Sequence, residues 1–171
     1  MNGTMRVWTG LLALALSAGL TGCRSEVLPV PTEAEAAAYF EAVPRARVQV
    51  SGNVAEVTVA QSAAQLRRGG VLWARVGPYI YLFSEPTRDL FTDFPGLAAV
   101  RVVTTAAGGD EVARATLARH TLNDLTWRRA LNIAGLARRD GTRRMTLLED
   151  LVEWGEDHTE YTYNPRYAER R

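Results

Sequence analysis

Few residues in this chain of 171 can carry chemistry, and the two histidines are the first to consider. His158 stands in the run Glu156-Asp157-His158-Thr159-Glu160, whose carboxylates and imidazole are ligands for a divalent cation or groups for a hydrolase. The run has no second histidine at helical spacing, which favours an acidic helix end in solvent. His120 ends an expected strand, and we expect a surface histidine there. No metal site is predicted.

Other familiar catalytic arrangements do not occur in the sequence. All 20 basic residues are arginines, so Schiff-base lysine catalysis, a phosphate-loop lysine and a Ser–Lys dyad are excluded. No serine stands in a G-x-S-x-G motif. Gly108-Gly109 lies in an expected hairpin turn, and not between a strand and a helix as a phosphate loop would. The sequence therefore nominates no catalytic residue and no cofactor.

Four arginines, at positions 138, 139, 143 and 144, bracket one expected loop. Their guanidinium forks are suited to holding a phosphate or a carboxylate, which makes Arg138, Arg139, Arg143 and Arg144 a candidate anion site. Cations also decorate helix ends, where they interact favourably with the helix dipole and pair with acids such as Glu149 and Asp150. The second interpretation is the simpler one, and both stay open at this point.

The N-terminal residues combine one charge, an apolar run and a cysteine. Arg6 precedes the uncharged segment 7–20, which is shorter than the roughly 20 apolar residues that cross a bilayer. Small and polar residues follow it, as in a signal peptide. The segment ends in Leu20-Thr21-Gly22-Cys23, and Cys23 is the one cysteine of the chain, so no internal disulfide can form.

Residues 1–23 resemble the precursors of bacterial lipoproteins, whose lipobox places a leucine three positions before the cysteine. The resemblance implies cleavage between Gly22 and Cys23, and acylation of Cys23, which becomes the new N-terminus. Several acyl chains hold a protein stably at a bilayer, whereas one chain holds it only marginally. In Gram-negative members of the family an aspartate after the cysteine tends to retain the protein in the inner membrane. Arg24 stands there in this chain, which favours the outer membrane, facing the periplasm.

Removal of residues 1–22 leaves 149 residues, enough for a single domain. This part holds 19 arginines against 19 acidic residues and is formally neutral. Nucleic-acid binding depends on neutralising phosphates, so a nucleic-acid partner is not expected. We expect three parts: the leader 1–22, a lipidated tether 23–31, and one domain over 32–171.

Local patterns predict the elements of the domain. Thr32 and Glu35 form a capping box that opens a helix over 33–43. Segments 47–50 and 54–59 alternate apolar and polar residues and predict a hairpin. Segments 100–105 and 111–121 predict a second hairpin, across the turn at 107–110.

The remaining patterns favour helices. Apolar residues between 62 and 94 recur every three or four positions, which favours a helix bent near Pro78 over a hairpin of 71–76 with 79–83. A further helix is expected after Ser84 as its cap, with Pro86 in the first turn. Another should run from about 123 to 139. Thr146 and Glu149 predict a capping box for a last helix ending near Gly155, with an irregular tail from about 156.

Together these elements predict an α+β fold of two layers, in which two β-hairpins form a four-stranded antiparallel sheet packed against several helices. We expect a membrane-anchored envelope lipoprotein that binds an envelope protein or supports assembly, without catalysis. An envelope hydrolase using the 156–160 cluster and a carrier of a small apolar ligand remain alternatives. A cavity lined by Trp73, Tyr79 and Trp127 would favour the carrier, and an exposed patch among the aromatic residues between 73 and 94 would favour docking.

Overall fold

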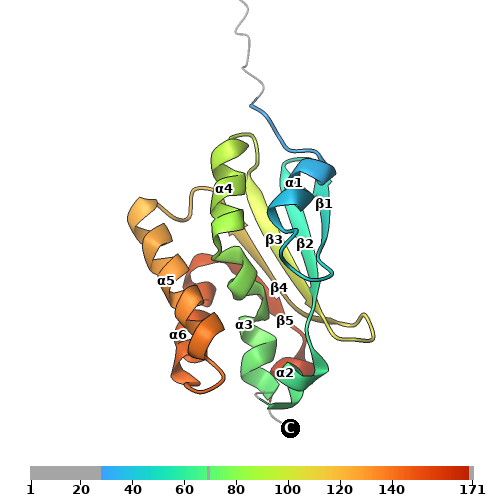
Figure 1. Ribbon diagram of the computed structural model, residues 1–171, viewed down its shortest axis with the longest axis vertical. Coiled ribbons are helices and arrows are strands. Elements are labelled where there is room, and N and C mark those ends of the chain that lie inside the picture. The colour runs from blue at the N-terminus through green and yellow to red at the C-terminus, as the bar shows by residue number, and fades with distance from the viewer. Residues whose placement is uncertain (1–27, 69, 170–171) are drawn as a thin grey trace, which may run out of the picture.

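The computed structural model describes residues 28–68 and 70–169, which form a five-stranded sheet with helices packed against one of its faces (Figure 1). The predicted cleavage and acylation site, Gly22 and Cys23, lies outside the described residues. The elements in chain order are α1 (Glu33–Tyr39), β1 (Arg47–Ser51), β2 (Val54–Ala60), α2 (Ala63–Arg68), α3 (Gly70–Leu82), α4 (Glu85–Asp93), β3 (Ala99–Thr105), β4 (Glu111–Ala118), α5 (Asp124–Asp140), α6 (Thr146–His158), β5 (Glu160–Tyr163) and α7 (Pro165–Ala168).

The strands join in chain order, β1-β2-β3-β4-β5. Both predicted hairpins are confirmed, as β1 with β2 and as β3 with β4. The predicted four-stranded antiparallel sheet is wrong, because β2 and β3 run parallel, with Val54 opposite Ala99 and Ala60 opposite Thr105, and because a fifth strand is present. The connection explains the parallel pair: α2, α3 and α4 carry the chain back along the sheet, so that β3 starts at the end where β2 started. The α+β class itself is confirmed.

The predicted irregular tail from about residue 156 is also wrong. Helix α6 continues to His158, and β5 then pairs antiparallel with β4, Tyr161 opposite Ala115 and Tyr163 opposite Ala113. The short helix α7 follows. Tyr161 and Tyr163 alternate with polar residues, which is a strand pattern, but four residues are too few to stand out without the neighbouring strand.

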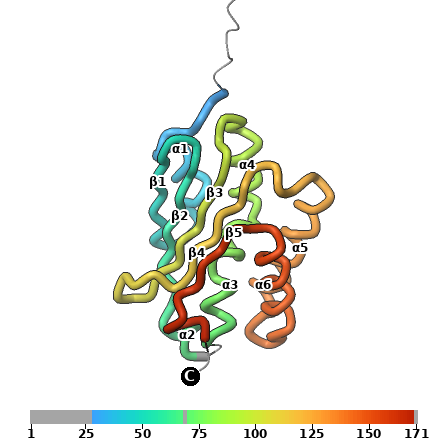
Figure 2. The backbone as a smooth tube through the Cα atoms, turned by 180° about the vertical axis from the view of Figure 1, so that it is seen from behind, coloured from blue at the N-terminus to red at the C-terminus, as the bar shows by residue number. Residues whose placement is uncertain are grey.

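The two faces of the sheet differ in what covers them. Ala55, Val57 and Val59 of β2 are buried on the face that packs against the helices. Figure 2 shows the sheet from the opposite side, where the strands lie in front of the helices. On that face Glu56 and Arg101 are ion-paired at 3.3 Å, and Arg101 Nε donates to Thr116 Oγ1 at 3.2 Å. Helices therefore cover one face, and polar side chains bridge neighbouring strands on the other.

The helical interpretation of residues 71–83 is confirmed. Helix α3 runs from Gly70 to Leu82 with Pro78 inside it. The buried Gln61 donates from Nε2 to the Trp73 carbonyl at 2.8 Å, in the turn that precedes Pro78. Proline lacks the N–H that would bond the carbonyl four positions earlier, that of Ala74, so the Gln61 donor lies beside a turn that Pro78 leaves one hydrogen bond short. No helix within the described residues is both long enough and apolar enough to span a membrane.

Two helices start at the residues that the sequence predicts, and a third lacks its predicted capping box. The capping box of Thr32 and Glu35 is present, although α1 ends at Tyr39 and not at residue 43. Helix α4 follows Ser84 with Pro86 in its first turn, but the Ser84 hydroxyl donates to the Tyr81 carbonyl instead of capping. The predicted capping box at Thr146 is wrong: Met145 already has helical backbone angles, so Thr146 lies inside α6 and its side chain does not cap it.

Candidate functional site

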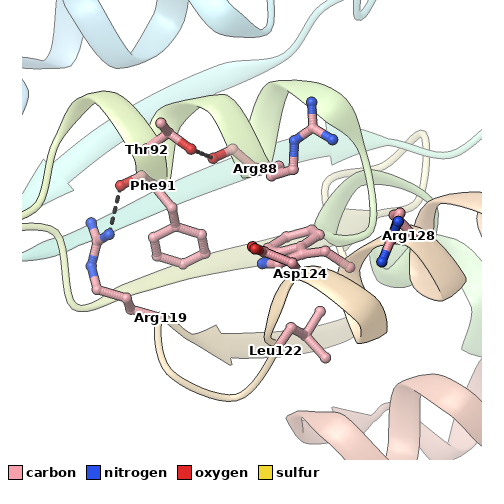
Figure 3. Close-up of a pocket in the computed structure, with 8 residues that line it drawn as sticks. Arg88, Phe91, Thr92, Arg119, Leu122, Asp124 and Arg128 are labelled. Atoms are coloured by element: carbon pink, nitrogen blue, oxygen red, sulfur yellow. Dashed lines mark hydrogen bonds between the residues drawn. The ribbon is translucent and has the colours of Figure 1, made fainter.

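A cavity of about 550 Å³ opens between α4, the connection from β4 to α5, and the first turns of α5 (Figure 3). We call it the arginine hollow, because three arginines stand around two aromatic rings and one leucine. Its lining is Arg88, Phe91, Thr92, Arg119, Leu122, Asp124, Trp127 and Arg128.

Helical spacing brings these side chains together. Arg88, Phe91 and Thr92 of α4 stand at positions i, i+3 and i+4, which share one helix face, and Asp124, Trp127 and Arg128 of α5 repeat that spacing. The rings of Phe91 and Trp127 meet edge to face, with centroids 6.4 Å apart.

The cap of α5 fixes where its first turn lies. The Asn123 side chain accepts hydrogen bonds from the amides of Leu125 and Thr126, both at 3.0 Å. It thereby satisfies two of the backbone donors that a helix leaves open at its N-terminus. Asp124 and Arg128 stand one turn apart beyond this cap, at the rim of the hollow.

Arg119 holds the end of α4 in place. Its guanidinium donates to the carbonyls of Leu97 at 2.6 Å and Phe91 at 2.5 Å, and also to that of Phe94. Carbonyls at a helix C-terminus lack partners within the helix, and a planar fork of donors satisfies several of them at once. The Arg119 guanidinium also lies 5.0 Å from the centre of the Phe91 ring. Burial lowers the pKa of Arg119, but arginine stays charged at any physiological pH.

The arginines around the hollow differ in whether an acid neutralises them. Arg88 is paired with Glu85 at 2.5 Å and with Asp89 at 3.4 Å. Within the described part of the chain Arg128 has neither an ion pair nor a hydrogen bond from its side chain. Asp124 is the one acid of the lining. Arg88 is neutralised by its two acids and Arg119 is bonded to carbonyls. Arg128 is therefore the guanidinium that remains to bind an anion, and the aromatic floor favours an anion with an apolar neighbour.

A second polar cluster joins α3, α6 and β5. The hydroxyls of Tyr79 and Tyr163 are 2.6 Å apart, and the Tyr163 hydroxyl donates to Glu156 Oε1 at 2.9 Å. Arg75 is ion-paired with the same carboxylate, and its guanidinium lies 5.2 Å from the centre of the Tyr163 ring. Each member satisfies another, so the cluster ties β5 to the helices.

We expect this cluster to make the protein less stable in alkali. Burial raises the pKa of Tyr79 to about 12, and burial together with the bonds to Tyr79 and Glu156 raises the pKa of Tyr163. An unfolded tyrosine titrates near pH ~10. Above that pH the folded state keeps tyrosine protons that the unfolded state loses. The contribution of the two tyrosines to the free energy of unfolding is therefore complete below the unfolded pKa and is lost as the pH rises through the folded pKa. The expected slope is about 1.4 kcal/mol of unfolding free energy per pH unit for Tyr79.

Urea unfolding at stepped alkaline pH checks this expectation. Tyr79→Phe should reduce the slope, whereas Tyr161→Phe, which removes an exposed hydroxyl from the same region, should not. Equal slopes in the wild type and Tyr79→Phe would contradict it.

The four arginines of the predicted anion site do not surround the arginine hollow. Arg138 and Arg139 are in the last turn of α5, Arg143 and Arg144 are in the connection to α6, and all four are exposed. Arg139 pairs with Asp140 at 2.9 Å. Figure 1 places this connection at the end of the molecule away from the start of the described chain. Anion binding by these four residues stays a prediction.

Asp157, His158 and Glu160 of the histidine cluster line one cavity of about 520 Å³ at the end of β4, and Glu156 is not part of that lining. His158 contacts the Trp154 carbonyl through Nδ1 at 2.8 Å, and its ring stacks on Trp154 at 3.9 Å between centroids. Glu156 belongs instead to the cluster with Arg75 and Tyr163. Within the described residues no three His, Cys, Asp or Glu side chains gather to hold a metal ion. His120 is exposed just after β4.

The three aromatic residues of the carrier hypothesis lie apart. Tyr79 is completely buried, with its ring against Gly155. Trp73 lines a hollow of about 360 Å³ beside Ser62 and Thr142, whereas Trp127 lines the arginine hollow. The described residues therefore do not bring the three around one cavity.

Sequence reasoning missed the arginine hollow because its lining comes from two helices and a connection that are far apart along the chain. The available signal was the repeated spacing of a charged residue, an aromatic residue three positions later and a polar residue after that, at 88–92 and 124–128. This spacing indicates a shared cavity only if the two helices are neighbours in space. No protein-family model, curated protein or solved structure matches this chain.

Proposed function

We propose that this protein is an envelope lipoprotein, held at a bilayer by acylated Cys23, whose domain is a non-enzymatic module that binds an envelope protein or supports assembly. The observation that carries the proposal is the run Leu20-Thr21-Gly22-Cys23 after a charged start and an apolar segment. In a Gram-negative host, Arg24 after the cysteine favours the outer membrane, facing the periplasm.

The start of the domain supports this proposal. The described chain begins at Leu28, five positions after Cys23, and the first helix is capped at Thr32. The Gly96 amide donates to the Pro29 carbonyl at 2.8 Å, which fixes the segment against the loop between α4 and β3. A β-carbon at position 96 would lie 2.4 Å from the Leu28 carbonyl oxygen, so only glycine allows this close approach. The described segment that contacts the domain therefore starts five positions after the proposed acylation site.

The polar clusters support a binding role over catalysis. Glu156 and Tyr163 contact each other and Arg75, and Arg119 is occupied by three carbonyls. These interactions stabilise the fold. The sheet face without helices, with its row of Glu56, Arg101 and Thr116, provides an accessible polar surface for a protein partner.

The test of the anchor is Cys23→Ser in the full-length precursor. The wild type should stay with membranes after a salt wash and should yield an N-terminal peptide with the mass of acylated cysteine. The variant should either stay uncut, with the apolar segment 7–20 still attached, or be cut and released. Release should appear as at least about a tenfold fall in the membrane fraction, because several acyl chains contribute about 0.8 kcal/mol per buried methylene. Ser25→Ala is the matched control. An unmodified Cys23 in the mature protein, or a variant still cut and still membrane-bound, would overturn the proposal.

A further inference from the structure

We propose that the end of the domain beside the tether is a membrane-docking surface, in which the arginine hollow takes the phosphate of an anionic phospholipid headgroup and Leu28, Val30 and Leu125 enter the interface. This inference rests on the proposed function for the source of the membrane. It goes further in assigning the surface, the ligand class and the orientation of the domain.

The first observation is the reach of the tether. Leu28 stands five positions after Cys23, and an extended chain spans at most about 3.6 Å per residue, so the two positions are at most about 18 Å apart. The bond from Gly96 to Pro29 fixes this segment at one end of the domain, beside the C-terminus of α4 and the start of β3. That end must lie at the headgroups whenever Cys23 is acylated.

The second observation is that the arginine hollow opens at the same end. Phe91 and Thr92 belong to the last turns of α4, and Arg119 directly follows β4, whose last residue Ala118 lies opposite Ala99, the first residue of β3. In Figure 1 the C-terminus of α4 and the first turn of α5 lie towards the tether, and the connection from α5 to α6 lies away from it.

The third observation is the position of exposed apolar side chains. Leu28, Val30 and Leu125 are 49%, 38% and 68% exposed, and all three belong to the tether or to the first turn of α5. Apolar side chains flanked by cations are typical of surfaces that lie in a membrane interface. Leu125 is next to Asp124 of the hollow, so this apolar side chain adjoins the basic lining.

The chemistry of the hollow fits a phosphate that is attached to lipid. Arg128 has no ion pair within the described residues and lies across the hollow from Arg119 (Figure 3). It is the guanidinium available to a phosphate, because Arg88 is paired with two acids and Arg119 is bonded to backbone carbonyls. Guanidiniums bind phosphate in a bidentate manner. Phe91, Leu122 and Trp127 form an apolar floor, which suits a headgroup that continues into glycerol and acyl chains.

The experiment measures binding of the unacylated mature chain, residues 23–171 with Cys23→Ser, to vesicles. Vesicles of equal parts phosphatidylglycerol and phosphatidylcholine are compared with vesicles of phosphatidylcholine alone. We expect binding to the anionic vesicles, weakened by added salt. Arg128→Gln should weaken it about fivefold, because a basic residue near an anionic surface contributes about 1 kcal/mol. Leu125→Ser should weaken it by about fivefold or more, through the loss of apolar burial.

Two variants at the opposite end are matched controls. Arg67→Gln makes the same change of charge at an exposed position in α2, and Met145→Ser removes an exposed apolar side chain from the connection between α5 and α6. Both should change binding less than about twofold, because those positions lie beyond the Debye length of about 8 Å from the surface. Unfolding curves establish that each variant is folded.

Three results would overturn the docking surface: no binding to anionic vesicles, equal losses in Arg128→Gln and Arg67→Gln, or binding of inorganic phosphate in solution without any binding to vesicles. The last result would assign the hollow to a soluble anion. Because this chain carries no acyl group, the outcome is independent of acylation in cells. An unmodified Cys23 together with vesicle binding would reject the proposed function and leave the docking surface standing.

Discussion

Replacing Gly155 by alanine is expected to destabilise the protein by about 2–3 kcal/mol, although alanine favours helix more than glycine does. A β-carbon at position 155 would lie 2.5 Å from the ring atoms Cδ1 and Cγ of Tyr79. The ring cannot move aside at low cost, because it is completely buried and its hydroxyl is bonded to that of Tyr163. The gain in helix propensity is at most about 1 kcal/mol, so the steric cost decides the sign.

Gly135→Ala provides the matched control. Gly135 is also inside a long helix, α5, and a β-carbon there meets nothing within 4 Å. This change should stabilise the protein by about 0.5–1 kcal/mol. Urea unfolding followed by circular dichroism separates the two. Equal effects of the two substitutions would show that α6 does not pack on α3 through Gly155.

The second large effect is expected from Arg119. Arg119→Met keeps much of the side-chain length but removes the side-chain donor from the carbonyls of Phe91 and Leu97. The Phe94 carbonyl also loses its bond from Arg119 and keeps the one from the Leu97 amide at 3.0 Å. We expect a loss of about 2–4 kcal/mol, because bonds from a charged donor are each worth about 1.5–3 kcal/mol and water replaces part of them here. Arg119→Lys should recover less than half of the loss, since an ammonium lacks the planar fork.

Arg114→Met is the control for Arg119. Arg114 lies in β4, five positions before Arg119, and is exposed. Within the described residues it pairs only with Glu111, at 2.6 Å. Exposed ion pairs contribute little, so its loss should stay within about 1 kcal/mol. Thermal unfolding of the four proteins provides the comparison. A loss as small for Arg119→Met as for Arg114→Met would mean that the end of α4 is held by other contacts.

Local patterns predicted those elements whose cause is local. The capping box of Thr32 and Glu35 depends on residues three positions apart, and it is present. The hairpins follow from alternation over adjacent segments. The helix over residues 70–82 was predicted despite Pro78, because apolar residues recur at helical spacing on both sides of the proline, and it is present.

The larger errors arose where the cause is distant along the chain, whereas the local capping pattern at Thr146 failed because Met145 is already helical. The direction of β3 relative to β2 depends on the path of α2, α3 and α4, which no strand pattern contains. Strand β5 exists because β4 offers it an edge, and Tyr163 contacts Tyr79 from 84 positions away. The arginine hollow has the same origin, since Phe91 and Trp127 meet only when α4 and α5 are neighbours. Which strands and helices become neighbours cannot be predicted from the periodicity of apolar residues alone.

The order of the strands in the sheet has a consequence for biosynthesis. Because each strand pairs with the one synthesised just before it, the sheet can grow at a single edge as the chain is synthesised. The two hairpins close short loops, which is fast, but docking β3 on β2 must wait for α2, α3 and α4, and docking β5 on β4 must wait for α5 and α6. Until each helical segment has been synthesised, the unpaired edge of β2 or of β4 is open to neighbouring chains.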